Sequence, residues 1–181
     1  MLYHASCPDG FAGAYAAWKK LGDSADYIAV YHGDLPPDIT GKETYVIDFS
    51  YPKDTLLELE KKAKRLVVLD HHEGAKEAVT AIREHVYDES RSGTGIAWEY
   101  FHPGTTLPRL LAYIQDGDMW KWERPFAKEV GGFVSSLKFE FDLFDPIVQK
   151  AETEEGFAEI VAKGKAYREY YDYICDKIIE Q

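Results

Sequence analysis

The chain has 181 residues, of which 45% are hydrophobic and 14% aromatic, and this composition excludes a largely disordered protein. Acidic residues outnumber basic ones by 32 to 21, a net charge of −11, which argues against binding to long duplex nucleic acid. The chain has no apolar run of membrane-spanning length, no secretory signal pattern and only two cysteines, at opposite ends, so we expect a cytoplasmic protein that makes no membrane contact.

The first two-thirds of the chain alternate short apolar runs with helical patterns. The apolar runs predict strands over residues 2–5, 26–32, 44–50, 65–72 and, more weakly, 81–87. Helices are predicted between them, over 11–21, 53–64 and 93–101. The run at 66–69 is continuously apolar, which is typical of a strand buried on both faces. Strands that alternate with helices indicate βαβ units, so the sequence predicts an α/β fold with a doubly wound parallel sheet.

From residue 107 onward the pattern is mostly helical. Pro108 suits the first turn of a helix over 107–122, and Gly131-Gly132 is interpreted as a helix break. Residues 155–179 place an apolar stripe along one long helix, too long for a small lobe to cover completely. We therefore expect residues 121–181 to form a helical extension that packs on a domain over 1–120 or forms an oligomer interface, and we predict a homodimer.

Apolar runs that end in His or Asp recur along the chain. Because the carboxyl ends of parallel strands share one edge of the sheet, we expect these side chains to converge there. Asp9 would join them from the loop after the first strand, whereas a single Asp at such a place is ordinarily a turn residue or an N-cap. Crowded carboxylates repel one another, and a divalent cation relieves that repulsion. The side chains concerned are His4, Asp9, Asp48, Asp70, His71, His72 and Asp116.

Together these motifs resemble the DHH phosphoesterase superfamily. The resemblance covers roughly residues 1–120 and implies an N-terminal α/β lobe that binds Mn²⁺ or Mg²⁺, two ions in all. The family includes single-strand exonucleases, nano-RNases, cyclic-dinucleotide phosphodiesterases, pyrophosphatases and exopolyphosphatases. The matching motifs are His4 with Cys7-Pro8-Asp9-Gly10, then Val46-Ile47-Asp48, Asp70-His71-His72 and Ile114-Gln115-Asp116.

The resemblance also implies a role for each of these residues. Asp48 would bridge the two metal ions, and the catalytic residues would be His72, Asp48 and Asp70. His72 would face the substrate phosphate, and Asp70 would orient the histidines. Two cations lower the pKa of a bridging water, and the resulting hydroxide attacks phosphorus in line. The implied metal ligands are His4, Asp9, Asp48, His71 and Asp116, with Asp118 as the alternative to Asp116.

The sequence departs from the family pattern in two places. Cys7 stands where the family usually has an aspartate; it is either a thiolate ligand or, more simply, a small pocket residue beside a weaker metal site. The residues after Asp116 are also too few for the family's usual second lobe, so we expect no full second lobe.

The segment 90–95 offers candidate phosphate-binding groups at the start of a helix. Arg91 could bind a phosphate bidentately, together with Ser92 and Thr94. The alternative is an ordinary N-cap beside a solvated Arg91.

We therefore predict a metal-dependent phosphohydrolase. It would cleave phosphodiester, phosphomonoester or phosphoanhydride bonds of a small phosphorylated substrate, such as a short single-stranded oligonucleotide, a nucleotide or polyphosphate. The alternative is a regulatory module that binds a nucleotide or a metal at a degenerate site without hydrolysing anything.

Overall fold

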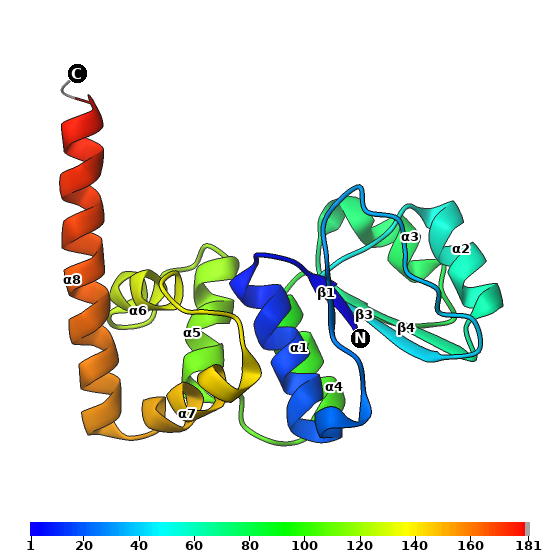
Figure 1. The fold of residues 1–181 in the computed structure, drawn as a ribbon, viewed down its shortest axis with the longest axis horizontal. Helices are drawn as coiled ribbons and strands as arrows, with labels where there is room; N and C mark the ends of the chain where they lie inside the picture. Colours follow the sequence, from blue (N-terminus) through cyan, green and yellow to red (C-terminus); the bar gives the residue numbers. More distant parts are fainter. Residues whose placement is uncertain (180–181) are drawn as a thin grey trace. The chain divides into compact units, whose positions relative to one another are not determined.

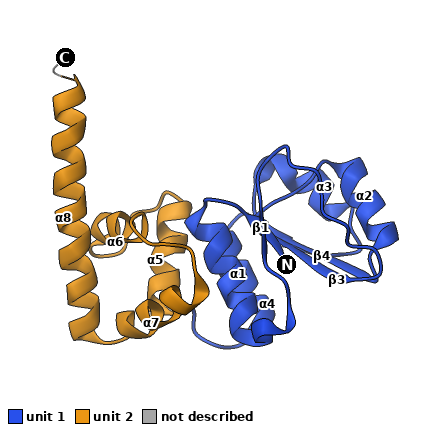
Figure 2. Cartoon of the chain, in the orientation of Figure 1, with its two compact units in different colours: residues 1–107 blue, residues 108–181 orange. Residues whose placement is uncertain are grey.

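The structure, a computed structural model, describes residues 1–179 (Figure 1). Two compact units divide between Leu107 and Pro108 (Figure 2). The division falls before the helix that carries Asp116, so this residue belongs to the second unit. The domain boundary that the sequence predicts after residue 120 stays a prediction. Among residues 1–179, no helix is both long enough and apolar enough to cross a lipid bilayer.

The first unit is built on a parallel five-stranded sheet. Helices cover it on both sides, α1 and α4 on one face and α2 and α3 on the other (Figure 1). The strands lie in the order β2-β1-β3-β4-β5 and every neighbouring pair is parallel. The predicted doubly wound α/β fold is thereby confirmed. The elements are β1 (Leu2–His4), α1 (Pro8–Leu21), β2 (Ile28–Val30), β3 (Glu43–Ile47), α2 (Lys53–Lys62), β4 (Arg65–Asp70), α3 (Lys76–Thr80), β5 (Glu84–Tyr87) and α4 (Gly93–Phe101), with 3₁₀ turns at Gly22–Ser24 and Glu73–Ala75.

The apolar run of β4 explains how one strand serves two cores. Leu66 and Val68 pack in the core under α2 and α3, whereas Val67 and Leu69 pack in the core under α1 and α4. Successive side chains of a strand point to opposite faces, so a strand between two helical layers has to be apolar at every position.

The strand order sets where a ligand can bind. From β1 the chain crosses to β2 on one side, and it then returns to add β3, β4 and β5 on the other. The sheet therefore reverses its winding between β1 and β3, and the connections on either side leave a crevice at the carboxyl ends of these two strands. His4 is the last residue of β1 and Asp48 directly follows β3. Both residues thus lie at this switch point.

Among residues 108–179, the regular elements of the second unit are all helices. It comprises α5 (Arg109–Asp118), α6 (Ala127–Val134), α7 (Phe141–Ala151) and α8 (Glu154–Ile179). The helix break expected at Gly131-Gly132 is wrong, because both glycines lie inside α6. A Cβ on Gly164 of α8 would lie only 1.8 Å from the carbonyl oxygen of Glu129, and one on Gly132 would lie 3.1 Å from that of Gly164. Glycine is needed at these positions because the backbones of α6 and α8 approach closely.

The long helix α8 packs through its first half only. Phe157, Ile160 and Gly164 are buried, whereas Tyr167, Tyr171 and Ile178 are 47%, 68% and 67% exposed. The expected apolar stripe is therefore present, and its far end is uncovered in the single chain. Exposed apolar stripes of this kind commonly mark a contact with another protein surface. The homodimer stays a prediction.

Light scattering at micromolar concentration tests the homodimer. We expect a particle of about twice the 20.6 kDa mass of one chain. Glu in place of Tyr171 and Ile174 should return it to the monomer mass, because burying two carboxylates in an apolar interface is costly. Lys165→Glu, on the opposite side of α8, is the control. A wild-type particle of monomer mass would contradict the prediction.

Candidate metal centre

Asp48 is the centre of the candidate site, and its backbone is unusual. Its N–H donates to the carbonyl oxygen of Leu69 at 2.9 Å, which extends the β3–β4 pairing by one residue. Its φ is +55°, a left-handed conformation that costs a residue other than glycine about 1–2 kcal/mol. Asp tolerates this conformation better than most residues. Strain of this kind clusters at functional sites, where it directs a side chain.

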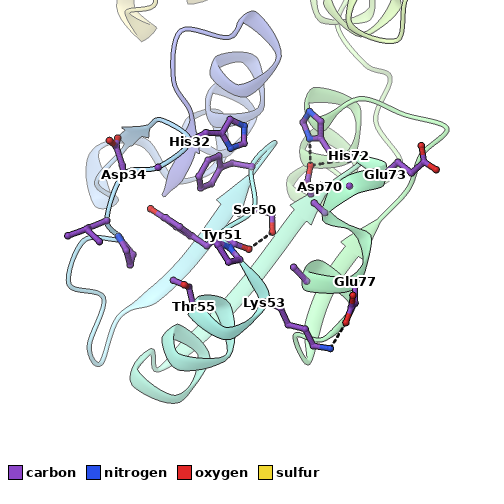
Figure 3. A pocket seen from close by; sticks show the side chains of 18 residues that line it. His32, Asp34, Ser50, Tyr51, Lys53, Thr55, Asp70, His72, Glu73 and Glu77 are labelled. Atoms are coloured by element: carbon purple, nitrogen blue, oxygen red, sulfur yellow. Dashed lines mark hydrogen bonds and ion pairs between the residues drawn. The ribbon is translucent and has the colours of Figure 1, made fainter.

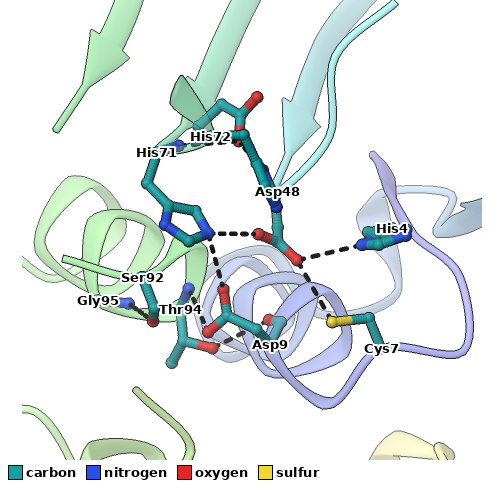
Figure 4. A network of polar contacts seen from close by, with 10 residues as sticks. His4, Cys7, Asp9, Asp48, His71, His72, Ser92, Thr94 and Gly95 are labelled. Atoms are coloured by element: carbon teal, nitrogen blue, oxygen red, sulfur yellow. Dashed lines mark hydrogen bonds and ion pairs between the residues drawn. The ribbon is translucent and has the colours of Figure 1, made fainter. Parts of the chain in front are cut away.

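The Asp48 carboxylate lies between side chains from three other places in the chain (Figure 4). His71 Nε2 lies 3.2 Å from Asp48 Oδ1, and His4 Nδ1 lies 3.6 Å from Asp48 Oδ2. The thiol of Cys7 donates to Asp48 Oδ2 across 3.6 Å. Asp48 therefore belongs to two groups of possible metal ligands, one with His4 and Cys7, the other with Asp70, His71 and His72.

The spacing of these atoms suits divalent cations. In each group the candidate ligand atoms lie within 4.8 Å of one another. Around an octahedral ion with bonds of about 2.1 Å, neighbouring ligands lie about 3 Å apart and opposite ones about 4.2 Å apart. His4 Nδ1 and Asp48 Oδ1 are buried, and neither makes a hydrogen bond to a described residue. Buried polar atoms ordinarily have a partner, and a cation would supply one here.

The charge state of Asp48 also suits a cation. The residue is 1% exposed, and burial by itself would raise the pKa of its carboxyl group. The neighbouring His4 and His71 side chains outweigh that effect and hold the pKa of Asp48 at about 2. The carboxylate is therefore ionised at neutral pH, as a metal ligand has to be.

Without a bound cation, the Cys7 thiol is uncharged. Burial and the negative charge of Asp48 raise the pKa of the Cys7 thiol to about 12. The sulfur therefore keeps its proton at neutral pH and donates it to Asp48. The two interpretations of Cys7, a small pocket residue and a thiolate ligand, stay predictions, because a bound cation would itself lower the pKa of a coordinating thiol.

Asp9 comes from the first turn of α1, not from a loop as expected, because Pro8 starts the helix earlier than predicted. Asp9 is 1% exposed, and its Oδ2 lies 4.0 Å from His71 Nε2. The N–H of Thr94 donates to Asp9 Oδ1 at 3.1 Å, and the Thr94 hydroxyl donates to the Asp9 carbonyl oxygen at 2.9 Å. Thr94 thus holds Asp9 in place from the first turn of α4.

Gly93 brings the same helix close to the Asp48 carboxylate. A Cβ on Gly93 would lie 2.5 Å from Asp48 Cβ and 2.7 Å from Asp48 Oδ1. Only a residue without a side chain therefore allows the N-terminus of α4 to come this close. The partial positive charge of a helix N-terminus stabilises nearby carboxylates.

Asp70 contacts both histidines that follow it. Its Oδ1 accepts a hydrogen bond from the His71 N–H at 2.8 Å and lies 2.7 Å from His72 Nδ1. The contact between Asp70 Oδ1 and His72 Nδ1 orients the imidazole ring. The His72 side chain is 47% exposed, and a ligand can therefore reach it.

The remaining predicted residues lie elsewhere or are differently engaged. Arg91 pairs with Asp88 at 2.6 Å. Ser92 is the N-cap of α4, where its Oγ accepts from the Gly95 N–H at 3.4 Å, as the alternative interpretation of this segment had it. Ser92 and Thr94 are fully buried, so contact with a substrate would require movement. Their substrate-binding role, like that of Arg91, stays a prediction.

Asp116 and Asp118 lie in the last turn of α5, in the second unit. Asp116 is 6% exposed, its Oδ1 accepts from the Glu123 N–H at 3.3 Å, and its Oδ2 makes no hydrogen bond to a described residue. Asp116 as a metal ligand, with Asp118 as the alternative, stays a prediction.

Sequence reasoning missed one residue beside the cluster. The His32 ring lies 5.0 Å from the ring of His4 and 4.9 Å from that of Phe49, measured between ring centroids. The signal was its position at the end of the predicted strand 26–32, which the structure shortens to Ile28–Val30.

Replacing Cys7 with Asp tests whether this position belongs to the metal centre. The new carboxylate would stand about where the sulfur lies, 3.6 Å from Asp48 Oδ2. We expect Mn²⁺ to bind about tenfold more tightly, because an added charged oxygen strengthens a hard-cation site. The metal-free variant should melt at a lower temperature, because two carboxylates then repel each other. Calorimetric titration measures the affinity, with Cys7→Ser as the neutral control. Unchanged or weaker Mn²⁺ binding would place Cys7 outside the centre.

Comparisons with known proteins identify a structure with a similar fold, and they indicate no activity. No family model matches the chain. The chain is similar to an uncharacterised protein of Acanthamoeba polyphaga mimivirus, with 29% identity over 199 residues; the match covers all of this chain and 46% of that protein. The chain thus spans about half the length of this curated relative. An uncharacterised protein from Helicobacter pylori G27 has a similar crystal structure, with a TM-score of 0.69 and 14% identity over 90% of this chain and 59% of that one. This likeness extends to the fold alone.

Proposed function

We propose that the chain is a metal-dependent phosphohydrolase that acts on a small phosphorylated substrate. The observation that carries the proposal is the pair of candidate ligand groups that share the buried, ionised Asp48. His4, Asp9, Asp48 and His71 would hold two Mn²⁺ or Mg²⁺ ions, and Asp116 is the further ligand that the DHH resemblance implies. Carboxylate oxygens are ligands that suit Mn²⁺ and Mg²⁺.

The protein's own residues supply position and charge. Divalent cations bound at the cluster would lower the pKa of a water molecule and neutralise phosphoryl oxygens. Thr94 keeps Asp9 in place, and the close approach of the Gly93 backbone leaves little room beside Asp48. Asp70 turns His72 so that its partly exposed ring can meet a phosphoryl oxygen of the substrate. Such positioning is the main contribution of residues that surround a metal centre.

A second candidate function is a binding module without hydrolysis. The observation that favours it is Cys7, a protonated thiol where the family pattern has a carboxylate. A weakened site could bind a nucleotide or one metal ion and still fail to activate water.

One experiment separates the two functions. Purified protein is incubated with Mn²⁺, Mg²⁺ or Co²⁺ and with a 5′-phosphorylated dinucleotide, a nucleoside bisphosphate or pyrophosphate. Release of phosphate or mononucleotide that stops on addition of EDTA supports the phosphohydrolase. Calorimetric binding of Mn²⁺ and nucleotide with no product over hours supports the module. Failure to bind any of the three metal ions would contradict the proposed metal centre.

A further inference from the structure

A cavity of about 850 Å³ opens beside the candidate metal centre (Figure 3). It lies between the segment after β2 and the first turns of α2 and α3, within the first unit. Asp70 and His72 line the cavity and are also members of the metal-ligand cluster. A molecule whose phosphoryl group is at the cluster can therefore extend into the cavity. Its volume is within the range of about 300–1,000 Å³ that is usual for small-molecule sites.

The charges on the cavity walls do not suit a chain of phosphates. Lys53 is the only lysine or arginine among the lining residues, and its ammonium group is already bound to Glu77 at 2.8 Å. Asp34 and Glu73 add further negative charge to the lining. An inorganic polyphosphate would meet repulsion here, whereas an uncharged group would not.

Apolar and aromatic groups form the rest of the wall. The exposed His32 ring packs against Phe49, and Leu35 is 90% exposed although it lines the cavity. Both side chains could be covered by a flat ring, which would remove the exposed surface of Leu35 from water. Stacking of a base on an aromatic side chain is a common form of nucleotide binding.

Tyr51 offers a polar group at the same place. The residue is 4% exposed, and its hydroxyl makes no hydrogen bond to a described residue. The ring extends toward the segment that carries Asp34 (Figure 3). A buried hydroxyl ordinarily has a hydrogen-bond partner. A small shift of the segment that carries Asp34 would let a ligand reach Tyr51, and a polar atom of that ligand would then be the partner.

We propose that this cavity binds the nucleoside part of a nucleotide whose phosphoryl group lies at the Asp/His cluster. The inference rests on the proposed phosphohydrolase and names its substrate class as nucleotides, not polyphosphates. His32 and Leu35 cover the base, and Tyr51 donates a hydrogen bond to the nucleoside.

Kinetics with a matched pair of substrates test the inference. One is 5′-phosphorylated diadenylate, and the other has the same backbone with hydrogen in place of both bases. With Mn²⁺, the wild-type protein should show a kcat/KM at least tenfold higher for the diadenylate. Ala78 lines the cavity at α3. Ala78→Phe, which places a ring there, should reduce this preference to less than twofold without changing hydrolysis of the abasic compound. Ala166→Phe, the same change at an exposed position of α8, should keep the full preference.

Tyr51→Phe is a second variant that tests the inference even if Ala78→Phe does not fold. It removes one oxygen, so the fold should persist, and we expect KM for the diadenylate to rise about threefold or more with little change in kcat. Equal cleavage of the two compounds by the wild-type protein would overturn the inference and leave the proposed function intact.

A binding measurement without metal decides the case in which neither compound is cleaved. Leu35, Ala75 and Ala78 line the cavity, and their methyl NMR signals are followed during titration with adenosine, guanosine, cytidine and uridine, which carry no phosphate that metal-free carboxylates would repel. We expect shifts of these three signals with at least one nucleoside, and none for Ala166. Absence of shifts with all four nucleosides at millimolar concentration would overturn the inference, whereas absence of cleavage alone counts against the proposed hydrolase.

Discussion

Replacing Asp48 with Asn is expected to abolish Mn²⁺ binding and to lower phosphohydrolase turnover at least 100-fold, about 2.7 kcal/mol of barrier. Asn keeps the volume of Asp and tolerates the left-handed backbone at this position, so the change removes the charge with little distortion. Both candidate ligand groups lose their shared member, and a neutral amide is a poor substitute for a carboxylate on a hard cation.

The same variant has a pH-dependent effect on the metal-free protein. The pKa of Asp48 is held at about 2, below its ordinary value of 3.8. A lowered pKa means that the ionised form stabilises the fold above about pH 4 and that this stabilisation is lost as pH falls toward 2. We expect Asp48→Asn to lower the unfolding free energy by up to about 2 kcal/mol at pH 7. At pH 3 the unfolding free energies of the variant and the wild type should differ by less.

Urea denaturation at the two pH values and calorimetry with Mn²⁺ check these expectations. Asp172→Asn, at an exposed position of α8, is the matched control and should change neither quantity. A variant that kept more than about a tenth of wild-type turnover would show that Asp48 is not shared by two metal ions.

Replacing Gly93 with Ala is expected to weaken Mn²⁺ binding about 10- to 100-fold without touching a ligand directly. The added methyl group would lie 2.5 Å from Asp48 Cβ, far inside contact distance. Either the N-terminus of α4 moves away or Asp48 turns, and overpacking of this kind costs about 1–3 kcal/mol of stability. Movement of α4 also disturbs Thr94, which positions Asp9.

Gly74→Ala separates this effect from the general effect of a glycine substitution. A Cβ on Gly74 meets nothing within 4 Å, and the backbone there is not left-handed. We therefore expect the melting temperature and the Mn²⁺ affinity of this variant to match wild type within error. If Gly93→Ala also matched wild type in both measurements, the close approach of α4 would be unimportant for the metal centre.

The sequence alone was enough to predict the class of fold and the place where polar side chains gather. The continuously apolar strand β4 required a helical layer on each face, and alternating strands and helices required parallel pairing. Residues at the carboxyl ends of parallel strands meet at one edge whatever the strand order, so His4, Asp48 and His71 could be placed together before any contact was known. These are consequences of local periodicity and chain direction.

Only the tertiary structure decided how the side chains around Asp48 are held. The hydrogen bond from Thr94 to Asp9 joins residues 85 positions apart, and the contact of Gly93 with Asp48 depends on how closely α4 packs. The cavity beside His72 forms because separate segments of the chain come together around it. Local patterns determine which element a segment forms, whereas the distances between elements follow from how side chains of distant segments pack against one another. That packing also made Gly132 part of a helix contact and left half of the α8 stripe uncovered.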